Sequence, residues 1–293
     1  MAPITAIIDK SAPDDRVIKL FYNTGKAQLG LALWSGTKDA DPEDSIQTPQ
    51  EVGNGQYILN PSQMASVNFK GAERVFALTT ANPFKVTRND TYTLSEVSPA
   101  YQKLQEDIII GNITIASCAS DDNAWVYFSR PIGDSSRNLW ELDLQTSRTT
   151  QLIFTHDLWI NSFAAAWYDT ITGKRSVIYE GSSLMEYVVD DATNGRAIAS
   201  TGDMQRNTPV AVAFNAGTVF LYYCGRGAAG GIRRTIRRNN TWGTSTLIDG
   251  ITIAQDSQLT VVRANGINHL LYVARGQNEA EDDYFVHYRD EIE

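Results

Sequence analysis

The chain has 293 residues, of which 42% are hydrophobic and 20% charged, the balance of an ordinary soluble protein. Its formal net charge of −9 argues against nucleic acids and anionic membrane surfaces as partners. The N-terminal residues lack the charged and apolar regions of a signal peptide, and no apolar stretch is long enough to span a membrane, which together predict a cytoplasmic protein. The two cysteines, Cys118 and Cys224, are expected to be buried and reduced.

Short strands bracketed by turn residues follow one another along the whole chain in six groups of three. The expected strands lie at 4–8, 17–23, 28–34, 63–69, 74–79, 91–97, 113–119, 124–129, 138–144, 163–168, 175–180, 184–190, 210–215, 218–224, 232–238, 258–264, 269–274 and 284–290. Further outer strands are expected at 149–154 and 245–248. Only the segment 99–109 is a candidate for a helix.

The six groups are copies of one repeat. Each copy opens with a strand of small residues, such as AAAW at 164–167, and its second strand has an aromatic residue at the middle. These aromatic residues are Phe21, Phe76, Tyr127, Tyr179, Tyr222 and Tyr272. Consecutive members are 55, 51, 52, 43 and 50 residues apart in the sequence. A period near 50 with several strands per copy predicts a propeller, whose innermost strands converge and require small side chains.

We therefore expect an all-β protein that forms a six-bladed β-propeller. Six copies of about 49 residues account for the whole length, so a second domain is not required. The single domain divides into blades at approximately 1–55, 56–110, 111–155, 156–205, 206–253 and 254–293.

The motifs ERVFAL at 73–78 and TLSEV at 93–97 carry a family resemblance. The repeat resembles that of the fungal fucose-specific lectins, six-bladed propellers with an Ala-rich first strand, an Arg-Val-Tyr-type second strand and a Leu-x-Glu-type third strand. The resemblance implies a sugar between neighbouring blades, held by the second-strand Arg, the third-strand Glu and an aromatic residue of the next blade.

One copy of the six keeps both charged residues that the resemblance requires. This pair is Arg74 and Glu96 of blade two, the expected ligand-binding residues. Blade three keeps Glu141, but Trp125 stands where the Arg is expected. Most of the repeated sugar-binding pattern is therefore missing.

Blade four keeps Glu186, with Ser176 at the Arg position and Arg175 one residue away. Because side chains alternate along a strand, Arg175 is expected on the opposite face. The remaining blades offer Lys19 with no acid, Phe220 with Arg234, and His269 or Leu270.

Position alone suggests candidate catalytic residues. His156 lies in a loop expected at one mouth of the ring, and Trp125, Glu141 and Glu186 lie at the ligand positions of the blades. The spacing of His, Cys, Asp and Glu indicates no metal site, and the sequence has no phosphate-binding loop or nucleophile motif. We therefore expect neither a metal nor a cofactor.

Loss of the repeated pair favours a function other than multivalent sugar binding. We expect a cofactor-free enzyme that binds one apolar metabolite and promotes a cyclisation or isomerisation, a pericyclic Diels–Alder type included, in fungal secondary metabolism. Such a reaction requires shape and orientation rather than a nucleophile. The alternatives are a non-enzymatic fucose-binding lectin with degenerate sites and a structural propeller that binds proteins. The expected partner is thus a small-molecule metabolite or a fucose-type sugar, and a homodimer is left open.

Overall fold

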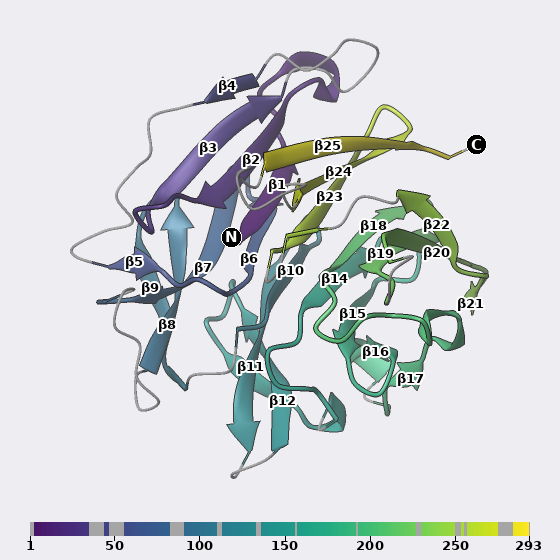
Figure 1. Ribbon diagram of the computed structural model, residues 1–293. Helices are drawn as coiled ribbons and strands as arrows, with labels where there is room; N and C mark the ends of the chain where they lie inside the picture. Colours follow the sequence, from purple (N-terminus) through teal and green to yellow (C-terminus); the bar gives the residue numbers. More distant parts are fainter. Residues whose placement is uncertain are drawn as a thin grey trace.

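The structure is a computed structural model that describes residues 3–34, 44–46, 56–82, 91–109, 113–132, 136–155, 157–191, 193–226, 230–249, 253–254, 257–274 and 284–292. Its strands form six antiparallel sheets that radiate from a common centre (Figure 1). Each sheet is one blade, and consecutive sheets follow the chain around the ring. The fold is the six-bladed β-propeller that the repeat predicted.

The first three blades run from an innermost strand outward, each strand pairing with the next. Blade one comprises β1 (Ile4–Ile8), β2 (Ile18–Asn23), β3 (Leu29–Trp34) and β4 (Asp44–Ile46). Blade two comprises β6 (Met64–Phe69), β7 (Ala72–Thr80), β8 (Thr91–Ser98) and β9 (Gln102–Ile109), with β5 (Tyr57–Ile58) pairing to the end of β7. Blade three comprises β10 (Ile115–Ala119), β11 (Ala124–Ile132), β12 (Ser136–Asp143) and β13 (Thr149–Leu152).

The last three blades have the same order, except that β21 and β22 of blade five both pair with β20. Blade four comprises β14 (Ala164–Asp169), β15 (Lys174–Glu180), β16 (Leu184–Val188) and β17 (Arg196–Ala197). Blade five comprises β18 (Val210–Asn215), β19 (Thr218–Cys224), β20 (Ile232–Arg238), β21 (Thr241–Trp242) and β22 (Thr246–Asp249), and blade six comprises β23 (Leu259–Ala264), β24 (Ile267–Ala274) and β25 (Tyr284–Glu291). The described helices are the short 3₁₀ turns η1 (Pro13–Asp15), η2 (Ile153–Thr155), η3 (Val189–Asp191) and η4 (Ala199–Thr201), and none of them is long or apolar enough to cross a membrane.

The innermost strands surround a central channel. Strands β1, β6, β10, β14, β18 and β23 are neighbours in this order, and β23 lies beside β1. Small side chains, among them Ala6, Ala65, Ala116, Ala165 and Ala211, line a cavity of about 210 Å³ between these strands. Larger residues would collide where six strands converge, which is the reason the small first strands predicted this arrangement.

Two buried glutamines connect the innermost strands to one another. Gln258 Oε1 accepts hydrogen bonds from the backbone N–H groups of Ile4 (3.2 Å) and Met64 (2.9 Å), and its Nε2 donates to the Met64 carbonyl (2.7 Å). Gln63 likewise accepts from Ile115 (3.1 Å) and Ala164 (2.9 Å). Each glutamine therefore ties together two blades other than its own.

The six predicted second-strand aromatics all lie in the core, with at most 5% of any one exposed. The six aromatic side chains do not all point to the same neighbouring blade, as residues at equivalent positions of a repeat would. Phe76 and Tyr127 face the following blade, whereas Tyr179 and Tyr272 belong to apolar clusters shared with the preceding blade. The equivalent residue in blade four is Ile178, so the aromatic pattern is offset by one residue there.

The expectation of a helix at 99–109 is wrong, because Gln102–Ile109 is the outer strand β9. Leu104 and Ile108 both pack on the core between blades two and three. Their spacing of four residues fits one face of a helix and one face of a strand equally well. The expected outer strands at 149–154 and 245–248 are confirmed as β13 and β22.

Both cysteines are confirmed as buried free thiols. Burial raises the pKa of Cys118 and of Cys224 to about 12. The thiols therefore stay protonated at neutral pH and pack as small apolar side chains.

Candidate functional site

Every blade turns one side chain of its second strand and one of its third strand toward the following blade. The third-strand residue is the cross-strand partner of the residue at the middle of the second strand, as in Phe76 with Glu96 and Tyr127 with Glu141. The second-strand residue that faces the following blade lies two residues before this middle residue. From blade one to blade six the pairs are Lys19 with Leu31, Arg74 with Glu96, Trp125 with Glu141, Ser176 with Glu186, Phe220 with Arg234, and His269 with His287. Six equivalent junctions thus contain six different pairs.

The junction of blades three and four holds a cavity of about 400 Å³, which we call cleft III/IV. Its walls include Trp125 and Glu141 of blade three and Tyr168, Arg175 and Asp190 of blade four. The rings of Trp125 and Tyr168 are stacked, with centroids 6.1 Å apart and an interplanar angle of 21°. The structure therefore brings together two of the residues singled out from sequence, Trp125 and Glu141.

Arg175 contacts residues of both walls of cleft III/IV. Its Nη1 lies 2.7 Å from Glu141 Oε1, and its Nε donates to Asp190 Oδ1 (3.1 Å). The guanidinium carbon lies 4.7 Å from the centroid of the Trp125 ring, within the range of a cation–π interaction. The neighbouring blade thus supplies the arginine that blade three lacks.

The sequence correctly placed Arg175 on the face opposite Ser176, but its partner was missed. In β15, Val177 and Tyr179 pack against blade three, and Arg175 shares their side of the strand. Ser176 and Ile178 face blade five instead. An arginine one residue out of register was a usable signal, because in a propeller the opposite face of a strand borders the previous blade.

Burial and charge act against one another in cleft III/IV. Burial raises the pKa of the Glu141 carboxyl, although the Arg175 guanidinium favours its ionised form. Burial alone would also raise the pKa of Asp190. The hydrogen bonds from Arg175 outweigh this effect and hold the pKa of Asp190 below its usual range. The cleft therefore combines aromatic surface, a guanidinium and carboxylates that can accept hydrogen bonds.

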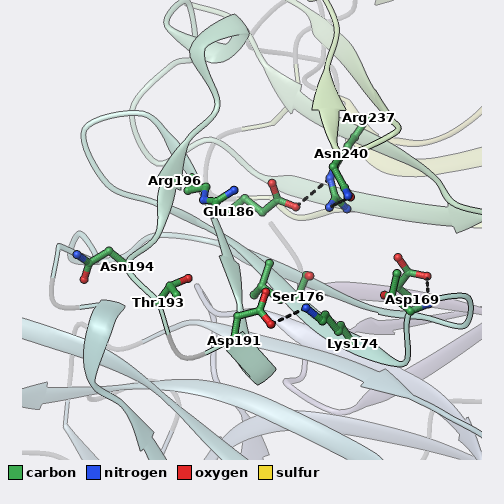
Figure 2. A pocket seen from close by; sticks show the side chains of 12 residues that line it. Asp169, Lys174, Ser176, Glu186, Asp191, Thr193, Asn194, Arg196, Arg237 and Asn240 are labelled. Atoms are coloured by element: carbon green, nitrogen blue, oxygen red, sulfur yellow. Dashed lines mark hydrogen bonds and ion pairs between the residues drawn. The ribbon is translucent and has the colours of Figure 1, made fainter.

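The junction of blades four and five holds a second cavity, cleft IV/V, of about 170 Å³. Figure 2 shows Arg237 and Asn240 reaching from blade five toward Glu186 of blade four, with Lys174 and Asp191 paired on the other side. The Arg237 Nε lies 3.3 Å from Glu186 Oε1. Glu186 Oε2 accepts a hydrogen bond of 2.9 Å from the Trp242 indole. Glu186 thus lies in a different cavity from Trp125 and Glu141.

Arg74 and Glu96, the expected ligand-binding residues, form an ion pair with one another. The Arg74 Nε donates to Glu96 Oε1 (2.8 Å), and its Nη2 pairs with Glu96 Oε2. Both side chains face blade three, where Phe76, Ala124 and Val126 fill the junction with apolar surface. The two charges are therefore largely satisfied by one another, and sugar binding by this pair stays a prediction.

A further cavity, of about 800 Å³, lies between blades one and two, with Lys19 and Glu73 in its walls. Contacts between blades cross this junction and the remaining ones. Lys19 pairs with Glu73 of blade two (2.8 Å), and Arg234 pairs with Asp290 of blade six (2.6 Å). In blade six, His269 Nδ1 and His287 Nε2 are 2.9 Å apart. His287 also meets the edge of Trp34 in blade one, with ring centroids 6.2 Å apart.

His156, the remaining candidate from sequence, lies outside the described residues. Within the part of the chain that the structure describes, no group of three or more His, Cys, Asp or Glu side chains is placed to hold a metal ion.

No protein-family model and no curated protein matches this sequence. Solved structures do match its fold. The fucose-specific lectin of Aleuria aurantia superposes with a TM-score of 0.64 at 11% identity, covering 97% of this chain and 94% of the lectin. The SapL1 lectin, solved in complex with alpha methyl fucoside, gives 0.61 at 10% identity over 99% and 96% of the two chains. AofleA from Arthrobotrys oligospora gives 0.60 at 10% identity over 99% and 86%.

This chain has the six-bladed propeller fold of these lectins. The agreement extends over almost the full length of each chain, so it covers all six blades and their order. It confirms the architecture that the sequence resemblance implied. At about one identical residue in ten, the likeness concerns the fold alone.

Proposed function

We propose that the protein is a non-enzymatic sugar-binding propeller whose principal site is cleft III/IV. The observation that carries this proposal is the joint presence of the Trp125 and Tyr168 rings and the Arg175–Glu141 pair in one cavity. An aromatic face covers the apolar side of a sugar ring, while charged groups hydrogen-bond its hydroxyls. A volume of about 400 Å³ suits a ligand of one or two sugar rings.

A fucose-type sugar is the ligand that we propose to test first. Two findings support this choice, namely the fold shared with fucose-specific lectins and the alpha methyl fucoside bound by SapL1. Cleft III/IV differs from the arrangement that the resemblance implies, because its arginine comes from the following blade. The pairing of a glutamate with an arginine beside an aromatic residue is nevertheless retained.

The expectation of a cofactor-free cyclase receives less support from the cavities. A polycyclic apolar metabolite requires a largely apolar pocket. Clefts III/IV and IV/V are lined mainly by charged and hydroxyl-bearing side chains, and the central channel is lined by small residues and backbone. The proposal therefore follows the lectin alternative rather than the enzyme.

Titration calorimetry with α-methyl fucoside tests the principal site. Trp125→Ala removes the aromatic face, and Glu141→Gln removes the carboxylate while Arg175 keeps Asp190. We expect each change to weaken binding at least about tenfold, the cost of one aromatic or charged hydrogen-bonding contact. The matched control is Glu106→Gln, an exposed glutamate of blade two, which should leave the affinity unchanged. Absence of binding at millimolar fucoside, or equal binding by all three variants, would refute the proposal.

A further inference from the structure

The three acidic side chains that line cleft IV/V already have hydrogen-bond donors of their own. The Asp169 carboxylate accepts from the backbone N–H groups of Ile171 (2.9 Å) and Thr172 (3.1 Å) within its own turn. Asp191 is held by Lys174, at 2.5 Å. The third acid, Glu186, accepts from the Trp242 indole and lies beside the Arg237 guanidinium. Lys174 and Arg237 are thereby paired, which leaves Arg196 as the basic side chain of the cavity without an acidic partner among the described residues.

Two side chains of cleft IV/V, Arg196 and Ser176, can donate hydrogen bonds to a ligand. The Arg196 guanidinium lines the cavity at its exposed rim and makes no hydrogen bond or ion pair with any described residue. At the inner end, Ser176 is only 3% exposed, yet its hydroxyl has no partner among the described residues. The hydroxyl therefore stays available to water or to a ligand in the cavity. Figure 2 shows both side chains in the same cavity.

We propose that cleft IV/V binds a hydroxylated carboxylate of the sugar-acid class. The planar guanidinium of Arg196 matches the geometry of a carboxylate and forms paired, charge-assisted hydrogen bonds with it. Ser176, deeper in the cavity, donates to or accepts from a ring hydroxyl. A neutral sugar can only accept hydrogen bonds from Arg196, whereas an acidic sugar also forms an ion pair with it.

The two clefts therefore select ligands of different charge. In cleft III/IV the arginine is already shared between Glu141 and Asp190, so a further carboxylate meets like charges there. Three acids and three bases line cleft IV/V, and Arg196 is the base that has no acidic partner among the described residues. The proposal concerns a separate cavity and holds whether or not cleft III/IV binds a neutral sugar.

The test compares glucuronate with glucose and acetate by titration calorimetry of the full chain at low salt. Glucuronate and glucose differ by the carboxylate, and acetate carries a carboxylate without hydroxyls. We expect glucuronate to bind, neither of the others to match it, and its affinity to fall as sodium chloride is added. Equal binding of glucose excludes a role for charge, and equal binding of acetate excludes recognition of the hydroxyls. Either result, or no binding of glucuronate, overturns the proposal.

Two substitutions with opposite expected signs locate the site. Arg196→Gln removes the free guanidinium and is expected to weaken glucuronate binding about tenfold. Glu186→Gln removes a negative charge and releases Arg237, so it is expected to strengthen glucuronate binding severalfold. If Glu186 instead held a sugar hydroxyl, as the lectin resemblance implies for this position, the same change would weaken binding. That outcome would overturn the proposal.

A matched control shows that the effect is local. Arg226→Gln alters an exposed arginine of blade five outside the cleft and should leave the glucuronate affinity unchanged. Thermal unfolding of each variant identifies any loss of fold, and Ser176→Ala provides a second change inside the cleft that conserves packing. Equal affinity of Arg196→Gln, Ser176→Ala and wild type would place the ligand elsewhere.

Discussion

At the scale of single residues, neighbours in one strand serve different clefts. Lys174 and Arg175 are adjacent in β15 and point to opposite faces, and their acidic partners are the adjacent Asp191 and Asp190. Arg175 and Asp190 belong to cleft III/IV, whereas Lys174 and Asp191 belong to cleft IV/V. Successive side chains of a strand point to opposite faces, and in a propeller the two faces border different clefts. Moving a charged residue by one position in the sequence therefore moves its charge from one cleft to the other.

The same strand ends in a carboxyl group that titrates near neutrality. Glu180 is fully buried, and its Oε1 accepts a hydrogen bond of 2.8 Å from the Asn207 backbone N–H. Burial raises the pKa of Glu180 to about 7, although the hydrogen bonds and Arg206 oppose the shift. The folded protein therefore holds this proton more tightly than the unfolded chain does.

Glu180 should make the folded protein less stable as the pH rises. Because the pKa in the folded state exceeds the ordinary value, its contribution is most favourable below about pH 4.5 and is lost between there and about pH 7. Glu180→Gln, which keeps the acceptor for Asn207, should remove this loss, on the order of 2 to 3 kcal/mol. Urea unfolding of both proteins at pH 4.5, 6 and 8 measures it. Parallel pH profiles for variant and wild type would contradict the prediction.

At the scale of elements, the innermost strands are joined by side chains rather than by a shared backbone ladder. Ile4 donates to Gln258 and Ala6 donates to the Thr260 hydroxyl (3.2 Å each), which links β1 to blade six. Each innermost strand forms its backbone hydrogen bonds with the second strand of its own blade. Its remaining backbone N–H and carbonyl groups therefore need hydrogen-bond partners from other blades. Gln63 and Gln258 supply such partners at the ends of four innermost strands.

Gln258→Ala should therefore be strongly destabilising for a substitution outside the apolar core. It leaves two backbone N–H groups and one carbonyl in blades one and two without their partner. We expect the free energy of unfolding to fall by about 3 kcal/mol, because each buried unsatisfied group costs roughly 1 to 3 kcal/mol. Gln145→Ala, in an exposed turn, is the control. A loss no larger than that of the control in urea unfolding would show that the three bonds contribute little.

At the scale of the whole molecule, the ring closes between blades six and one. The apolar cluster of this junction includes Ile4, Leu20 and Leu271, and the histidine pair of blade six lies beside Trp34. Burial lowers the pKa of His287 to about 4, and the neighbouring His269 and Arg289 act in the same direction. The junction is therefore built around a neutral imidazole.

Low pH should destabilise the junction between blades six and one. A histidine whose pKa is depressed in the folded state contributes its full stability above about pH 6.5 and loses it as the pH falls toward 4. His287→Gln should lower stability at pH 7.5 but flatten the decline between pH 6.5 and 4, by on the order of 2 to 3 kcal/mol. Thermal and urea unfolding across this range provide the measurement. An equally steep decline in the variant would assign the acid sensitivity to other groups.

Much of the architecture was predictable because it depends on local patterns that recur. The small first strands and the buried second-strand aromatics predicted the six blades and their order. The prediction of a helix at 99–109 was wrong, because Leu104 and Ile108 are four residues apart, a spacing that places two side chains on one face of either a helix or a strand. Tyr179 and Tyr272 fit the spacing of the aromatic repeat, although they face the preceding blade and not the following one.

The sequence by itself determined the propeller, the blade order, the buried thiols and the position of Arg74 and Glu96 on neighbouring strands of blade two. These follow from the period of the repeat and from residues close together within one blade. Only the tertiary structure decided that Arg175 completes the site of Glu141 and that Arg237 and Trp242 meet Glu186. The physical reason is that each cleft is built from two blades. Its partners lie about one repeat apart in the chain, and their meeting depends on which face of each strand borders the neighbour.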